Sequence, residues 1–136
     1  MNSVYWINRI MNDMYVNSGR EFWVGLSSTL PAKDGSNVTE PTGEDYARVQ
    51  LTAFSEADEG YIHNVDDLVF AKTASVWFPS DSKAAYWVLF DGAGADANLL
   101  SAGELLEPKT VETSSRITLA AETLGITLLD YEPDIG

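Results

Sequence analysis

Paired carboxylates are the first chemistry that this sequence offers. Three acidic doublets occur in it, Glu44-Asp45, Asp58-Glu59 and Asp66-Asp67. A glycoside hydrolase needs two carboxyl groups about 5 to 10 Å apart, one on each side of the sugar. Neighbouring side chains on an extended chain point to opposite sides, so no doublet meets this requirement alone. We therefore predict no catalytic residues and a protein that is not an enzyme.

Nucleophiles and metal ligands are scarce. The chain has no cysteine and a single histidine, His63, which excludes thiolate chemistry and a multi-histidine metal site within one chain. The segment from Asp91 to Asn98 is rich in aspartate and glycine and suits a calcium loop or a tight turn. Because the Asp-x-Asp-x-Asp-Gly spacing of a calcium loop is missing, the turn is favoured. We predict no metal and no cofactor.

Charge narrows the choice of partner. The formal net charge is −13, and the eight basic residues are scattered singly along the chain. Nucleic-acid binding needs clustered Lys and Arg, so we predict no nucleic-acid partner. No apolar run approaches the ~20 residues of a membrane span, and no membrane partner is expected. The acidic surface fits either simple solvation or docking onto a basic partner.

Residues 3–17 are predicted to form an α-helix. Asn2 or Ser3 can cap its start, and Gly19 stands where a left-handed cap ends a helix. The apolar arc of this helix is about 180° wide, whereas a surface helix needs about 100°. Either the helix is buried deeply in its own domain, or one flank contacts a neighbouring subunit. The second interpretation makes three residues candidate partner contacts: Trp6, Ile10 and Met14.

Residues 21–129 alternate between short apolar strands and turn signals. This pattern predicts a mainly β fold, an antiparallel β-sandwich or jelly-roll-like domain with one N-terminal helix. Residues 1–136 are expected to form a single domain, with an acidic tail at 130–136 and an irregular acidic segment at 55–67. The predicted strands are 22–27, 46–54, 68–70, a central strand at 85–90, one opening at 99–100, 109–112, 116–120 and 125–129.

A long loop is predicted at residues 31–43, marked by proline, glycine and asparagine. Loops of this length in a small domain usually make contacts of their own. We therefore add Lys33, Asp34 and Asn37 to the candidate partner contacts.

Arg48 follows this loop in the block from Glu40 to Val49. It shares a strand face with Tyr46, and in so acidic a chain we expect it to pair with Glu40, Glu44 or Asp45. Such a pair would fix the loop to the strand, which is a structural role.

Aromatic residues offer one further lead, because exposed rings on a sandwich can stack on sugars. Packing in the core explains most of them equally well. The aromatic residues on or near strands are Trp23, Trp77, Phe78, Tyr86 and Trp87.

An ordered set of short motifs runs through most of the chain. The motifs are Val24-Gly25-Leu26-Ser27 leading to Pro31, Thr39-Glu40-Pro41-Thr42-Gly43 with Tyr46-Ala47-Arg48-Val49, Leu68-Val69-Phe70, Phe90-Asp91, Leu99-Leu100 with Gly103, and Pro108-Lys109-Thr110-Val111. This ordered set resembles a family of small tailed-bacteriophage virion proteins, usually labelled tail fibre, head fibre or head decoration proteins. The chain departs from that pattern at Val88, where relatives often carry glycine, and in its longer N-terminal helix.

The resemblance implies a non-enzymatic structural protein on the exposed surface of the head or tail of a virion, made in the host cytoplasm. It implies the major capsid protein or tail proteins as partners, and we expect a homo-oligomer such as a trimer. A long fibre needs repeats or a coiled coil, and this chain has neither. The favoured hypothesis is therefore a capsid decoration or cement protein. The alternative is a tail or head fibre module that contacts host glycan.

Overall fold

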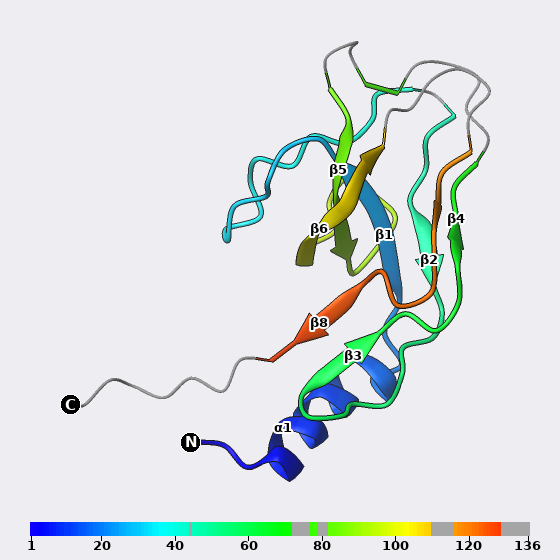
Figure 1. Cartoon of the computed structure of the whole chain (residues 1–136). Coiled ribbons are helices and arrows are strands. Elements are labelled where there is room, and N and C mark those ends of the chain that lie inside the picture. The colour runs from blue at the N-terminus through cyan, green and yellow to red at the C-terminus, as the bar shows by residue number, and fades with distance from the viewer. Residues whose placement is uncertain (44, 72–76, 79–81, 110–115, 129–136) are drawn as a thin grey trace.

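The computed structural model describes residues 1–43, 45–71, 77–78, 82–109 and 116–128. Antiparallel strands dominate this part of the chain, and its helix lies at the N-terminus (Figure 1). The mainly β fold class is thus confirmed. The elements are α1 (Val4–Met11), the π-helical turn η1 (Asn12–Val16), β1 (Phe22–Ser27), β2 (Val49–Leu51), β3 (Tyr61–His63), β4 (Leu68–Val69), β5 (Ala84–Phe90), β6 (Leu99–Lys109), β7 (Thr118–Leu119) and β8 (Gly125–Thr127).

The largest sheet has four strands in the order β2-β1-β5-β6. Phe22, Val24 and Leu26 of β1 are buried on one face, as the period-two pattern predicts. β5 is a central strand between β1 and β6, which explains why its last four residues are all buried. β6 is an edge strand of the described sheet.

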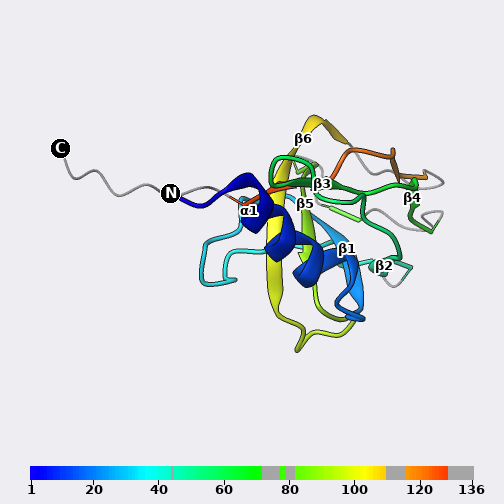
Figure 2. The same ribbon diagram turned by 90° about the horizontal axis from the view of Figure 1, so that it is seen from below.

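Two short strand pairs, β3–β8 and β4–β7, complete the β structure. Figures 1 and 2 both show β4 on the β2 side of the molecule, and Figure 1 shows β3 and β8 between α1 and the four-stranded sheet. Leu26 of the sheet, Ile62 of β3 and Leu119 of β7 belong to one hydrophobic cluster. The three sheets therefore share a single core, which also buries Trp77, Phe78 and Trp87.

Several predicted strand bounds are corrected. The strand predicted at 46–54 is shorter, Val49–Leu51, because residues 46–48 serve a polar network instead of a ladder. The segment 55–67, predicted to be irregular, contains β3. A new strand predicted at 109–112 is wrong at its start, since Lys109 ends β6, and residues 110–112 lie outside the described part.

β6 continues through Pro108 because of a bulge. Tyr86 of β5 pairs with Glu104, but Ala84 pairs with Lys109, so residues 105–108 face the one residue between them. Proline lacks a backbone donor and is tolerated at such a bulge. The bulge buries Leu105 and leaves Leu106 fully exposed.

Gly103 makes room for the buried indole of Trp87, its partner in the β5–β6 register. A Cβ atom at Gly103 would lie 2.5 Å from three atoms of that ring. We expect Gly103→Ala to lower the free energy of unfolding by about 1 to 3 kcal/mol, because the overpacked indole must move. Urea denaturation checks this, with Gly94→Ala as the control, since a Cβ at Gly94 meets nothing within 4 Å. Equal stability of the two variants would contradict the prediction.

Candidate functional site

Arg48 binds Glu40 through two parallel hydrogen bonds. Its Nη2 donates to Glu40 Oε1 at 2.6 Å, and its Nε donates to Glu40 Oε2 at 3.1 Å. Both side chains are largely buried, with 9% and 21% of their surfaces exposed. A planar guanidinium facing a carboxylate in this way is a strong, directional pair. Of the three predicted partners, Glu40 is the one that forms this salt bridge; Glu44 lies outside the described residues.

The guanidinium of Arg48 also binds the turn that follows β5. Its Nη1 donates to the carbonyl oxygens of Gly92 and Gly94 at 3.1 and 2.8 Å. Its Cζ lies 3.6 Å from the centroid of the Phe90 ring, within the range of a cation–π contact. Arg48 therefore joins the long loop to the end of the central strand.

Tyr46 completes this network through its hydroxyl group. Its hydroxyl donates to Glu40 Oε2 at 2.5 Å and accepts the backbone N–H of Leu26 at 3.2 Å. Burial raises the pKa of the Tyr46 hydroxyl far above its ordinary value, and the negative charge of Glu40 adds to the rise. The hydroxyl therefore stays protonated and available as a donor.

Gly25 leaves the space that this network occupies. A Cβ at Gly25 would lie 2.6 Å from the Tyr46 hydroxyl and 2.8 Å from Glu40 Oε2. The network formed by Glu40, Tyr46 and Arg48 thus fixes the loop against β1.

The N-terminal helix is attached by its polar side. Asn8 Oδ1 accepts the backbone N–H of Gly60 at 2.7 Å, and Asn12 Oδ1 accepts that of Ala57 at 2.8 Å. Ile7 and Met11 are buried beside them. The sequence pattern places Asn8 and Asn12 opposite the apolar arc, yet they face the protein. Two amides and two apolar side chains therefore hold the helix by one edge of its arc.

The other edge of the apolar arc is exposed. Trp6 is 52% exposed and Met14 is 42% exposed, whereas Ile10 is half-buried. We call the surface formed by Trp6, Ile10 and Met14 the α1 flank. Val4 and Tyr5 are also exposed in the first turn of the helix. The interpretation in which the helix is deeply buried is thus wrong for this edge. Contact of the α1 flank with a partner stays a prediction.

The loop with Lys33, Asp34 and Asn37 projects beside the sheet (Figure 1). Asp34 Oδ1 accepts hydrogen bonds from the Ser36 hydroxyl at 2.6 Å and from the Ser36 backbone N–H at 2.9 Å. These two bonds, the hydroxyl bond first, lower the pKa of the Asp34 carboxyl. Asn37 has a positive φ of 62° and donates through Nδ2 to the Leu30 carbonyl at 2.9 Å. The loop is therefore ordered by its own polar contacts.

The structure keeps the two groups of predicted partner contacts apart. Trp6, Ile10 and Met14 lie on the helix, whereas the loop residues lie beside β6, where Pro31, Ala32 and Lys33 line a shallow groove with residues 99–102. Neither group contains a described cluster of catalytic side chains. Contact of either group with another molecule stays a prediction.

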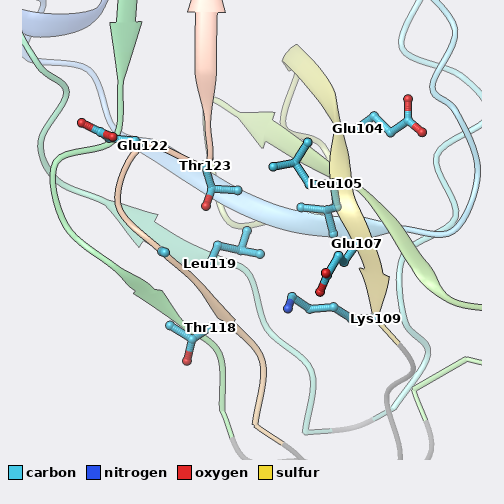
Figure 3. A pocket seen from close by; sticks show the side chains of 10 residues that line it. Glu104, Leu105, Glu107, Lys109, Thr118, Leu119, Glu122 and Thr123 are labelled. Carbon is cyan, nitrogen blue, oxygen red and sulfur yellow. The ribbon is translucent and has the colours of Figure 1, made fainter.

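A groove separates β6 from β7 and the turn that follows it (Figure 3). Its volume is about 370 Å³. Leu105 and Leu119, both buried, form its apolar floor, and exposed Leu106 lies at its rim. We call it the β6–β7 groove. Its charged lining residues are Glu104, Glu107, Glu122 and Lys109.

The segment from Asp91 to Asn98 is a turn, as favoured. Asp91 Oδ1 and Oδ2 accept the backbone N–H and side-chain amide of Asn98 at 2.7 and 2.9 Å. These bonds lower the pKa of the Asp91 carboxyl. Within the described part of the chain, no group of three or more potential metal ligands gathers. None of the helices described there has the length and apolar character needed to cross a bilayer.

A comparison with protein families gives a match over most of the chain. The family model described as podophage GP4 fiber I protein gp80 matches residues 2–127. The chain belongs to this family. Membership confirms the resemblance to tailed-phage virion proteins and shows a virion structural protein of the fibre type. A search of curated proteins finds no match.

Two features of the fibre-family chain escape sequence reasoning. The β6–β7 groove depends on a bulge in β6, which no local sequence pattern predicts. The inward placement of Asn8 and Asn12 depends on the distant backbone donors of Ala57 and Gly60. Their spacing of four residues, which puts both amides on one helix face, is the signal that could have indicated a shared partner.

Proposed function

We propose that this chain is a non-enzymatic subunit of a virion fibre, attached to a capsid or tail protein of the same particle. The observation that carries the proposal is the fibre-family match over residues 2–127. It favours the fibre hypothesis over the decoration hypothesis that the sequence analysis prefers. The compact β domain, which carries no repeats, then serves as one module of the fibre rather than as its shaft.

The surfaces of the molecule support a role in assembly. The polar network of Glu40, Tyr46 and Arg48 fixes the long loop against the sheet. The α1 flank, in contrast, exposes Trp6 and Met14. Tryptophan and methionine are enriched in protein interfaces. A host-glycan contact remains a secondary part of the fibre hypothesis.

The position of the chain on the particle tests this function. We would label intact virions with a gold-conjugated antibody raised against the purified chain and image them by electron microscopy. The proposal expects gold on fibres projecting from the head or tail. Gold spread evenly over the capsid shell would instead support the decoration hypothesis, and virions without label would contradict both.

A further inference from the structure

An exposed aromatic ring lies on the pair of strands β3 and β8, which run side by side in Figure 1. Tyr61 is 39% exposed. A Cβ atom at Gly125 of β8 would lie 2.7 Å from the Tyr61 hydroxyl and 2.8 Å from a carbon of its ring. His63 lies on the same face of β3, and the two ring centroids are 5.7 Å apart. Gly125 therefore leaves the space in which the Tyr61 ring rests on the neighbouring strand.

A hollow opens beside these two rings, and we call it the β3 pocket. Its volume of about 440 Å³ falls within the range of pockets that hold small ligands. Besides the rings, the lining offers a serine hydroxyl and three carboxylates. The lining residues are Ser55, Glu56, Asp58, Tyr61, His63 and Glu122.

His63 is held in one orientation by the backbone. Its Nδ1 lies 3.1 Å from the carbonyl oxygen of Asn64, and because a carbonyl oxygen can only accept, Nδ1 is the donor of this bond. Nε2 lies 3.9 Å from Glu122 Oε1, which is too far for a hydrogen bond. In the neutral imidazole, Nε2 therefore keeps a lone pair that can accept a hydrogen bond from a ligand.

The lining narrows the class of ligand. Three carboxylates repel an anion, and no group of three or more potential metal ligands gathers among the described residues. An ammonium or guanidinium group would satisfy the carboxylates, but it cannot accept a hydrogen bond from the Tyr61 hydroxyl. A sugar hydroxyl both donates and accepts. The C–H face of a pyranose ring is apolar and can pack on an aromatic ring.

We propose that the β3 pocket binds a neutral pyranose sugar. One face of the sugar ring stacks on Tyr61, and hydroxyl groups at its edge donate to the carboxylates of Asp58 and Glu122 and to Nε2 of His63. The inference rests on the proposed function and deepens it, because it gives the fibre subunit a sugar-binding site and names the residues that form it.

NMR titration of the isotope-labelled full chain tests this site. The probes are the methyl glycosides of glucose, galactose, mannose and N-acetylglucosamine. We expect at least one of them to shift the amide signals of residues 55–63 and 122–125. Methyl glucuronide, which carries a carboxylate, is expected to bind more weakly than methyl glucoside because the lining repels its charge.

Variants at two tyrosines make the result specific. Tyr61→Ala is expected to weaken binding about tenfold because it removes the stacking surface, whereas Tyr61→Phe keeps the ring and most of the affinity. Tyr5→Ala is the matched control, since Tyr5 is 71% exposed on the helix, and it is expected to bind like the wild type. Glu122→Gln, at a side chain that is 74% exposed, leaves the core untouched and is expected to weaken binding about threefold.

Three results overturn the inference. The first is the absence of shifts with all four glycosides, and the second is a Tyr61→Ala variant that binds as tightly as Tyr5→Ala. The third is a shift of the same signals by methylguanidinium alone, which would assign the pocket to an arginine side chain of a protein partner.

The labelled virions described above separate this inference from the proposed function. Gold on fibres together with a chain that binds none of the four glycosides overturns the sugar site alone. Gold spread over the capsid shell together with a chain whose sugar binding depends on Tyr61 overturns the proposed function alone.

Discussion

Replacing Arg48 with alanine is expected to lower the free energy of unfolding by about 2 to 4 kcal/mol. The change leaves the carboxylate of Glu40 without its cation in a site where only 21% of that side chain is exposed. It also removes the donors to the carbonyls of Gly92 and Gly94. Urea denaturation measures the loss, and limited proteolysis should show faster cleavage in the turn at 91–98.

Two matched variants make the Arg48 result specific. Arg48→Lys keeps the charge but loses the planar fork, so we expect it to recover part of the lost stability. Arg9→Ala removes an ion pair, Arg9–Asp13 at 3.3 Å, in which both side chains are more than half exposed. That pair is expected to contribute less than about 0.5 kcal/mol. If Arg48→Ala were as stable as Arg9→Ala, the network would have no structural importance.

Replacing Asn64 with aspartate is expected to cost about 3 to 5 kcal/mol at neutral pH. Asn64 is completely buried, and its Nδ2 donates to the carbonyl oxygens of Asp66 and Ala120 at 2.8 and 3.1 Å. Its Oδ1 accepts the backbone N–H of Leu124 at 2.9 Å. Aspartate keeps the acceptor but points a second oxygen at two carbonyl oxygens, in a site without water access.

The pH dependence of the Asn64→Asp variant follows from the same contacts. Burial and the facing carbonyls favour the neutral acid, so the folded-state pKa of Asp at this position lies above its unfolded value of about 3.9. The penalty relative to wild type is therefore full above the folded pKa and shrinks as the pH falls toward 4. Denaturation of both proteins at several pH values measures this difference, and a difference that grows in acid would contradict the argument.

Asn8→Asp is the control for the same chemical change at a different kind of site. Asn8 is half-buried and uses its side-chain oxygen to accept from Gly60, and a carboxylate retains that acceptor. We expect a cost below about 1 kcal/mol. A loss as large as that at Asn64 would mean that the destabilisation comes from added negative charge in general rather than from the burial of Asn64.

The sequence alone determined the features that depend on neighbouring residues. The period-two pattern from Phe22 to Ser27 predicted β1, and the apolar run ending at Phe90 predicted a central strand. Ser3 was one of two predicted caps, and its Oγ accepts the backbone N–H of Trp6 at 3.2 Å. Charge balance in an acidic chain also predicted that Arg48 pairs with Glu40, Glu44 or Asp45, and Glu40, eight residues away, forms the observed salt bridge.

Only the tertiary structure decided which of the helix's two edges is buried, because Asn8 and Asn12 bind backbone donors 52 and 45 residues away along the chain. The burial of Asn64 likewise depends on Ala120 and Leu124. The bulge that places Leu106 at the rim of the β6–β7 groove arises from the mismatch between β5 and β6. Local patterns report the preference of a segment for helix or strand, but contacts between distant segments select the partners of each polar group and each exposed side chain.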